Sequence, residues 1–187
     1  MLEEVARAAD VVKQGGVILY PTDTVWGIGC DASNPEAVKK VFDLKQRADH
    51  KAMIVLVGSV DDVDLYVESV PDIARDLIEF SDKPLTIVYD RGARLAPALL
   101  GEDGSIGIRV TRESFSAALC RRLRRPLVST SANISGQPAP AIFREISPEI
   151  IDGVDYVVDY RRDDTTRNCP STVMRLSAGG EFKILRP

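Results

Sequence analysis

Histidine and cysteine are scarce in this chain, and their scarcity limits the chemistry that the chain can perform. His50 is the only histidine, and the three cysteines, Cys30, Cys120 and Cys169, form no CxxC pair. A structural zinc site needs four closely spaced thiol or imidazole ligands, so none is expected. The odd, scattered set of cysteines also argues against a disulfide framework and is typical of a reducing compartment.

The common sequence signatures of nucleotide binding and of membrane insertion are missing as well. The chain has no GxxxxGK[ST] loop and no GxGxxG after a strand, so it would have to bind a nucleotide without those cradles. No apolar run approaches the roughly 20 residues that a membrane helix needs. The acidic N-terminal segment has a helical pattern and does not resemble a signal peptide. We therefore expect a cytoplasmic protein that does not associate with membranes.

The net charge of −4 gives no general attraction to nucleic acid. Basic residues nevertheless gather in two places, with four arginines within residues 121–125 and a pair at Arg161 and Arg162. A solvated helix face and a loop are the simpler interpretation of these clusters. A patch that contacts RNA or phosphate is the alternative.

Apolar periodicity and turn residues predict an α/β fold. One helix starts near the N-terminus and stops at Gly15-Gly16, and Asn34-Pro35 is a good start for a second. Further helical stretches are expected near 61–67, 72–81, 113–123 and 141–151. Strands are expected at 17–20, 52–58, 84–90, 105–110 and 126–130, and in YVVDY, STVMRL and FKIL. We predict a single domain, residues 1–187, with one sheet of mixed direction and helices on its faces.

The segment YPTDTVWG follows the first predicted strand and concentrates hydroxyl groups. Thr22 and Thr24 flank Asp23 at a strand end, where sheet enzymes place groups that bind ligands. A capped turn is the alternative explanation of this spacing. Trp26 could be either a core residue or a platform for a ligand.

A second polar segment, LVSTSANISG, follows the predicted strand at 126–130. Ser129, Ser131 and Asn133 alternate, so in an extended chain they project to one side. Small side chains here would let backbone N–H groups converge on an anion, although the polar face of a strand would show the same pattern. The segment PSTV, which contains Ser171, has hydroxyl residues of the same kind but is a weaker signal.

Three cations complete the set of candidate residues. Lys45 and Arg47 can converge on one anion only if the helix ends there, and they suit a polyphosphate. We therefore expect Lys45 to lie in a loop and not in the core. The alternative is that they compensate the negative end of the helix dipole. Arg109 lies in an apolar strand and needs an anionic partner if it is buried, either a substrate carboxylate or a structural Asp or Glu.

Taken together, these segments resemble the YrdC/TsaC family of threonylcarbamoyl-AMP synthases. The matching segments are GGVILYPTDTVWGIGCDA, Lys45-x-Arg47, IGIRV, STSANISG and PSTV, in the order that the family has them. The resemblance extends from about residue 3 to the C-terminus and is to the short, single-domain form. It implies a twisted mixed sheet around a concave, cationic cavity.

The resemblance also implies an activity and a role for each residue. The enzyme would be a nucleotidyltransferase that uses L-threonine, bicarbonate and ATP with Mg²⁺, and releases threonylcarbamoyl-AMP and pyrophosphate. A downstream tRNA threonylcarbamoyl-transfer complex would use that product, and weak RNA or tRNA binding is compatible with it. Magnesium would be held by phosphates and not by protein side chains. Lys45 and Arg47 would stabilise charge. The ATP-binding residues would be Lys45, Arg47, Ser105, Ser131, Asn133 and Arg186, and the threonine-binding residues Thr22, Arg109, Ser129 and Ser171.

The chain departs from the family pattern at a few positions, and two other functions remain open. Leu56 stands where the family often has histidine, Trp26 replaces a usual tyrosine, and RADHKAM lacks prolines that are common there. One alternative is a YciO-like paralogue without synthase activity. The other is a non-catalytic RNA-binding module, although no aromatic-rich strand supplies a stacking platform.

Overall fold

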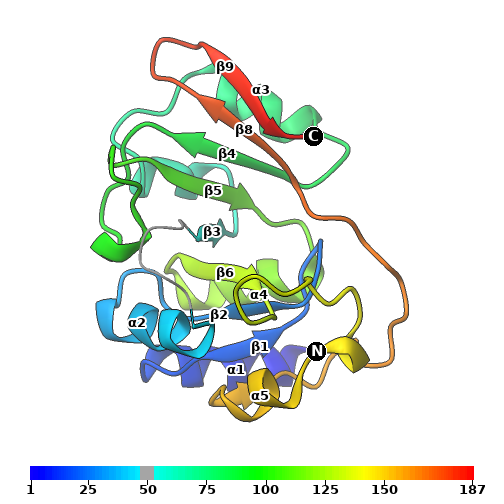
Figure 1. Cartoon of the computed structure of the whole chain (residues 1–187). Helices are drawn as coiled ribbons and strands as arrows, with labels where there is room; N and C mark the ends of the chain where they lie inside the picture. The colour runs from blue at the N-terminus through cyan, green and yellow to red at the C-terminus, as the bar shows by residue number, and fades with distance from the viewer. Residues whose placement is uncertain (47–52) are drawn as a thin grey trace.

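The computed structural model describes residues 1–46 and 53–187, and its core is one nine-stranded sheet (Figure 1). The strand order is β7-β1-β2-β6-β3-β5-β4-β8-β9. The strands are β1 Ile18–Tyr20, β2 Gly27–Gly29, β3 Ile54–Val57, β4 Leu85–Tyr89, β5 Ile106–Val110, β6 Leu127–Ser131, β7 Tyr156–Val157, β8 Thr172–Leu176 and β9 Phe182–Arg186. The helices are α1 Leu2–Lys13, α2 Pro35–Leu44, α3 Ile73–Phe80, α4 Ser114–Leu123 and α5 Pro148–Asp152, with short 3-10 turns η1 Asp61–Leu65, η2 Pro97–Leu99 and η3 Phe143–Glu145.

The sheet has mixed direction, which confirms the predicted fold class. β1 pairs in parallel with β7, β3 with β5, and β4 with β8. The remaining neighbours pair antiparallel. Among them is β6, which pairs antiparallel with both of its neighbours, β2 and β3. Parallel strands need covered faces, so a sheet of this kind depends on helices on both sides.

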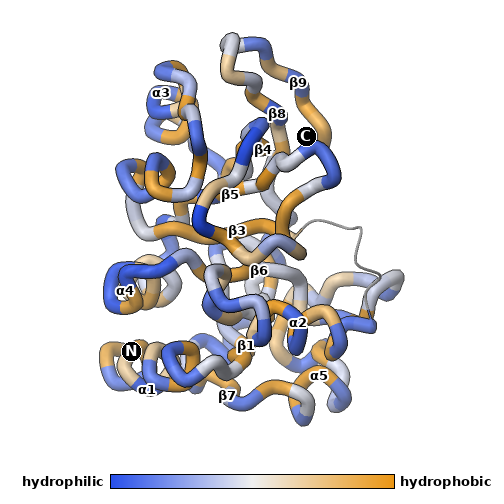
Figure 2. The backbone as a smooth tube through the Cα atoms, turned by 90° about the vertical axis from the view of Figure 1, so that its left-hand side faces the viewer, coloured by the Kyte–Doolittle hydropathy of each residue, from blue (hydrophilic) through white to orange (hydrophobic). Residues whose placement is uncertain are grey.

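Alternation along the strands divides the core into two layers. Ile18 and Tyr20 of β1 pack with Leu56 against α1 and α4, whereas Leu19 faces the opposite layer, which contains α2. This is the period of two that a strand imposes on its side chains. Figure 2 shows α1 and α4 along one side of the strands and α2 and α5 along the other. The sheet lies between these two layers of helices.

Most predicted elements are confirmed, and the differences have local causes. Asn34 caps α2 by accepting hydrogen bonds from the backbone N–H groups of Glu36 and Ala37, as its position predicts. The helix expected at 141–151 is divided into η3 and α5. Pro148 starts α5, and the residue before a proline is driven out of the helical region, so Ser147 is extended.

A buried carboxylate joins α1 to the β7 edge and gives a testable pH dependence. Glu4 accepts hydrogen bonds of 2.7 Å from Tyr156 Oη and from the backbone N–H of Asp159. Burial alone would raise the pKa of Glu4, but these two bonds, together with the nearby charges of Arg7 and Arg162, leave the pKa below its usual value. A depressed folded-state pKa stabilises the fold above the unfolded pKa and is lost as the pH falls through the folded value.

We therefore expect Glu4→Gln to lower the free energy of unfolding by about 1 kcal/mol at pH 7. The difference from the wild type should shrink as the pH falls below about 4. Urea unfolding at several pH values would measure this, with Glu3→Gln on the exposed side of α1 as the control. A difference that stayed constant with pH would contradict the assignment to the ionised carboxylate.

Candidate active site

A cavity of about 220 Å³ opens where the ends of several strands meet. Its walls come from the β1–β2 loop, the starts of β2 and β3, β5, β6, the residues before β8 and the end of β9. Six residues predicted from the sequence line it: Thr22, Arg109, Ser129, Ser131, Ser171 and Arg186. Two of these are arginines, and none of the described lining residues is acidic. The cavity is therefore suited to a ligand with anionic and hydroxyl-bonding groups.

The β1–β2 loop is both a capped turn and part of the cavity wall. The hydroxyl of Thr22 donates to the carbonyl of Val25 at 2.7 Å and accepts from the backbone N–H of Thr24 at 3.0 Å. The two threonine hydroxyls are 3.0 Å apart, and both residues line the cavity. The two interpretations of this segment are thus compatible, because the turn fixes the hydroxyls where a ligand can reach them.

Arg109 is 3% exposed, and its buried charge is met by a carboxylate of the protein itself. Its Nη2 lies 3.0 Å from Asp23 Oδ1, an ion pair without hydrogen-bond geometry, and 3.4 Å from the hydroxyl of Thr24. Its Nε has no hydrogen-bond partner among the described residues. Of the two partners considered from the sequence, the structural carboxylate is present. Capacity remains for a second anion, because Arg109 also lines the cavity.

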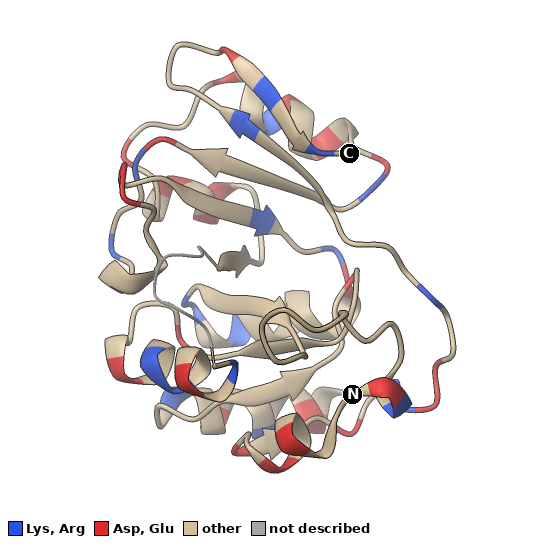
Figure 3. Cartoon of the chain, viewed as in Figure 1, with Lys and Arg blue, Asp and Glu red and all other residues tan. Residues whose placement is uncertain are grey.

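Burial disfavours the charged forms of both Asp23 and Arg109, because both side chains are removed from water. Burial lowers the pKa of Arg109, and the nearby carboxylate opposes that change. Burial raises the pKa of Asp23, and Arg109 only partly counteracts it. A guanidinium stays charged in proteins, so Arg109 presents a permanent cation to the cavity. Figure 3 shows a single basic band in β5, and Arg109 is the only Lys or Arg in that strand.

The alternation of Ser129, Ser131 and Asn133 stops where β6 ends. Ser129 pairs in register with Ile54 and Ser131 with Gly27, and both serines line the cavity. β6 ends at Ser131, so the alternation does not continue to Asn133. Asn133 Nδ2 donates to the carbonyls of Ile134 and Gln137 and so holds the following turn. Asn133 does not line the cavity, and its role in binding ATP remains a prediction.

Lys45 follows the last residue of α2, as expected, but it is not a loop residue exposed to solvent. It is 1% exposed, which contradicts our expectation that it lies outside the core. Its Nζ donates to the carbonyl of Ser131 at 2.5 Å and to that of Asn133 at 2.6 Å. Lys45 therefore fixes the end of β6, next to the cavity wall. Arg47, the other predicted cation, lies outside the described residues.

Ser171 and Arg186 form the opposite wall, and Ser105 does not join them. The hydroxyl of Ser171 is 2.8 Å from that of Thr86, and Arg186 Nε donates to the Ser171 carbonyl at 3.0 Å. Ser105 precedes β5, whereas Arg109 is near the other end of that strand. The Ser105 backbone N–H donates to Asp103 Oδ1 at 3.0 Å, and Ser105 does not line this cavity. Its contact with ATP remains a prediction.

Trp26 is both a core residue and part of the cavity wall. It is 5% exposed, it packs on Phe143 with ring centroids 4.9 Å apart, and it lines the cavity. Leu56, by contrast, packs in the layer of α1 and α4 and is not among the lining residues. Sequence reasoning missed the apolar wall residues Met53 and Ile54, which carried no polar signal.

Trp26 is the only tryptophan, so its emission should report on this cavity. We expect a ligand that fills the cavity to change the intensity or wavelength of tryptophan emission, because it would displace water beside the indole. Titration of threonine and ATP would show this, with D-threonine as the matched control. If an independent assay shows that the ligand saturates the protein and the Trp26 emission does not change, the ligand binds elsewhere.

No group of three or more His, Cys, Asp or Glu side chains in residues 1–46 and 53–187 could hold a metal ion. No helix in the same ranges is long and apolar enough to cross a membrane.

The fold and the cavity define an α/β protein with one mixed sheet and a small-molecule site at its strand ends. The chain belongs to the Sua5/YciO/YrdC family (Sua5_yciO_yrdC, described as "Telomere recombination"), which matches residues 10–187. It is 36% identical over 156 residues to the threonylcarbamoyl-AMP synthase of Stenotrophomonas maltophilia, covering 81% of this chain and 83% of the relative.

Solved structures give the same picture of the fold. P. abyssi Sua5 complexed with L-threonine is 25% identical, with a TM-score of 0.85. The match covers 98% of this chain and 53% of the Sua5 chain, so the chain spans about half the length of that structure. E. coli YciO is 23% identical with a TM-score of 0.82, covering 100% of this chain and 89% of YciO, and this likeness concerns the fold alone.

Proposed function

We propose that this protein is a threonylcarbamoyl-AMP synthase, a nucleotidyltransferase that acts on L-threonine, bicarbonate and ATP. The observation that carries the proposal is the gathering of Arg109 with the hydroxyls of Thr22, Ser129 and Ser171 around one cavity. An α-amino acid with a hydroxyl side chain presents a carboxylate and a hydroxyl, which are complementary to these groups. The curated relative carries the same activity in its name.

The proposed reaction needs no nucleophile from the protein. The amine of threonine adds to bicarbonate and water is lost, giving a carbamate. A carbamate oxygen then attacks the α-phosphorus of ATP, the bond to the β-phosphate oxygen breaks, and pyrophosphate leaves. Arg109 would hold the threonine carboxylate, with Thr22, Ser129 and Ser171 around it. Catalysis would come from positioning and from stabilisation of charge.

ATP would lie between Ser131 on the β6 wall and Arg186 on the opposite wall, with Lys45 behind Ser131. Lys45, Arg47, Ser105 and Asn133 complete the proposed ATP-binding set. Magnesium would neutralise the phosphates, and because no described lining residue is a carboxylate, phosphate oxygens and water would supply its ligands. The product would pass to a tRNA threonylcarbamoyl-transfer complex in the cytoplasm.

Pyrophosphate release tests the proposal directly. ATP would be supplied with threonine and bicarbonate, singly and together, and we expect release only when both are present. The control is serine, which lacks the methyl group and should be used less efficiently. Release that is independent of both, or no release by folded protein that binds ATP, would reject the synthase and favour a YciO-like paralogue. Salt-dependent RNA binding that survives Arg109→Ala would favour the RNA-binding module.

A further inference from the structure

A second and larger cavity lies at the other end of β3. It has a volume of about 420 Å³, against about 220 Å³ for the substrate cavity. Ile54 of β3 lines the substrate cavity, and Val57 of the same strand lines this one. Three residues of a strand span about 10 Å, so the two cavities are separate but close. We call the second cavity the arginine groove and define it by Val57, Tyr66, Cys120, Arg121, Arg124 and Arg125.

The floor of the arginine groove is apolar and its rim is cationic. Val57, Tyr66 and Cys120 are at most 9% exposed and form the floor, and Arg121, Arg124 and Arg125 are exposed at the rim. The stem of Arg121 lies over Gly58, where an added Cβ would come within 3.2 Å of Arg121 Cγ. A volume of this size is within the range of small-molecule sites.

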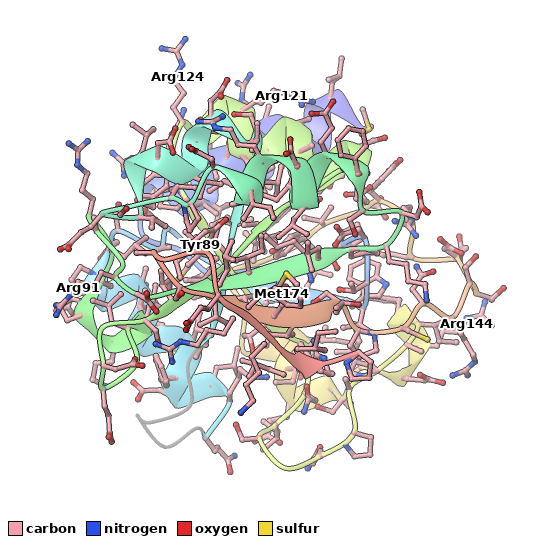
Figure 4. The ribbon with its side chains drawn as sticks, turned by 90° about the horizontal axis from the view of Figure 1, so that it is seen from above. Tyr89, Arg91, Arg121, Arg124, Arg144 and Met174 are labelled. Carbon is pink, nitrogen blue, oxygen red and sulfur yellow. The ribbon has the colours of Figure 1, made fainter. Side chains whose placement is uncertain are left out.

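The arginines at the rim differ in how their charges are met. Arg125 forms an ion pair of 2.6 Å with the buried carboxylate of Asp31. Within the described residues, neither Arg121 nor Arg124 has an ion pair. Asp62 also lines the cavity, and it is the one acidic residue among the described residues that do so. Figure 4 shows Arg121 and Arg124 projecting from the same side of the molecule, away from the sheet. Two available guanidinium groups thus stand beside an apolar floor.

Compensation of the α4 dipole accounts for only part of this arrangement. Arg121 and Arg122 are in the last turn of α4, where cations stabilise a helix. Arg124 is the C-cap, with φ 51° and ψ 34°, a left-handed conformation that normally favours glycine. Helix termination therefore does not explain why an arginine occupies this position.

We infer that the arginine groove binds a nucleotide. Its phosphate would lie on Arg121 and Arg124, and its base would lie on the apolar floor beside Tyr66. Guanidinium groups bind phosphate in a bidentate manner, and aromatic and apolar surfaces accept the flat face of any base. A free mononucleotide and an unstacked nucleotide of an RNA strand share this chemistry. This site is distinct from the one proposed for ATP.

Equilibrium dialysis of the full-length protein with labelled uridine 5′-monophosphate and with single-stranded octauridylate tests the inference. The variants are Arg121→Ala/Arg124→Ala and, as a matched control that removes the same charge, Arg122→Ala/Arg144→Ala. We expect the first pair to weaken binding at least about tenfold and the control to change it less than about twofold. Trp26 emission should not respond, because Trp26 lines the other cavity.

The two probes distinguish the sources of the ligand. Binding of the mononucleotide as tightly as the octamer would identify a free nucleotide, and much tighter, salt-dependent binding of the octamer would identify RNA. Absence of binding by the wild type, or equal binding by both double variants, would overturn the inference. So would binding that quenches Trp26 and is insensitive to Arg121 and Arg124. The assay contains no threonine or bicarbonate, so failure of the synthase proposal would not affect it.

Discussion

Substitution of Arg109 by alanine is expected to raise the KM for threonine about 100-fold while changing the KM for ATP less than about threefold. Loss of a buried charged partner costs about 2–5 kcal/mol of binding, and 2.7 kcal/mol corresponds to about 100-fold. Arg109 lines the cavity with the hydroxyls proposed to hold threonine, whereas the residues proposed to hold ATP, among them Ser131 and Arg186, do not include Arg109. Initial rates of pyrophosphate release at varied concentrations of each substrate would measure both constants.

The control for this experiment follows from the Asp23–Arg109 ion pair. Arg109→Ala leaves the Asp23 carboxylate buried without its cation, so it should also destabilise the fold by about 3 kcal/mol. The double variant Asp23→Asn/Arg109→Ala removes that charge and should regain most of the stability but none of the threonine affinity. Equal increases in both KM values, or recovery of threonine affinity in the double variant, would refute the carboxylate assignment.

Substitution of Lys45 by methionine is expected to destabilise the protein by about 1–3 kcal/mol and to abolish ATP turnover. Methionine keeps the stem but removes the Nζ donor from the carbonyls of Ser131 and Asn133. The Ser131 carbonyl keeps the backbone N–H of Asn133 at 2.9 Å, so the cost is mainly that of one unsatisfied buried acceptor at Asn133. The same change would remove the charge proposed to stabilise the phosphates. Urea unfolding and pyrophosphate release, the latter at a temperature where the variant is folded, would measure the two effects.

Lys40→Met on the same helix is the matched control for Lys45. Lys40 also donates to a backbone carbonyl, that of Gly15 at 3.0 Å, but it does so at the surface. The control should therefore change the free energy of unfolding by less than about 1 kcal/mol and leave turnover intact. If Lys45→Met were as stable as Lys40→Met, the two buried hydrogen bonds would not matter for folding. If it retained turnover, Lys45 would not act on ATP.

The elements of the fold were predictable because their signals are local. The cap at Asn34, the stop at Gly15-Gly16 and the apolar runs each depend on a few adjacent residues, and the structure confirms the resulting mixed α/β sheet. The cavity residues Ser129 and Ser131 were also predictable, because alternation along a strand is local. The same alternation failed at Asn133, where β6 has already ended.

The features that sequence reasoning could not supply depend on partners far along the chain. Lys45 is buried because it meets carbonyls in the segment after β6, whereas lysine is almost never fully buried without a partner. The partner of Arg109 is Asp23, a residue that sequence alone could equally assign to the turn. Met53 and Ile54 shape the cavity by size alone, and size without polarity leaves no signature in a single sequence.

The course of the chain between β7 and β8 has a consequence for the order of folding. This segment leaves one edge region of the sheet and crosses to the other, bringing Ser171 to β4 and, through β9, Arg186 to the cavity (Figure 1). Closing such a long span costs chain entropy that is recovered only when the distant strands pair, so pairings of this kind form late and slowly. The early strands can pair while one wall of the cavity is still absent. Ligand binding should therefore appear after most secondary structure in a refolding experiment, and a cut within 158–170 should remove binding before it unfolds the layer formed by α1 and α4.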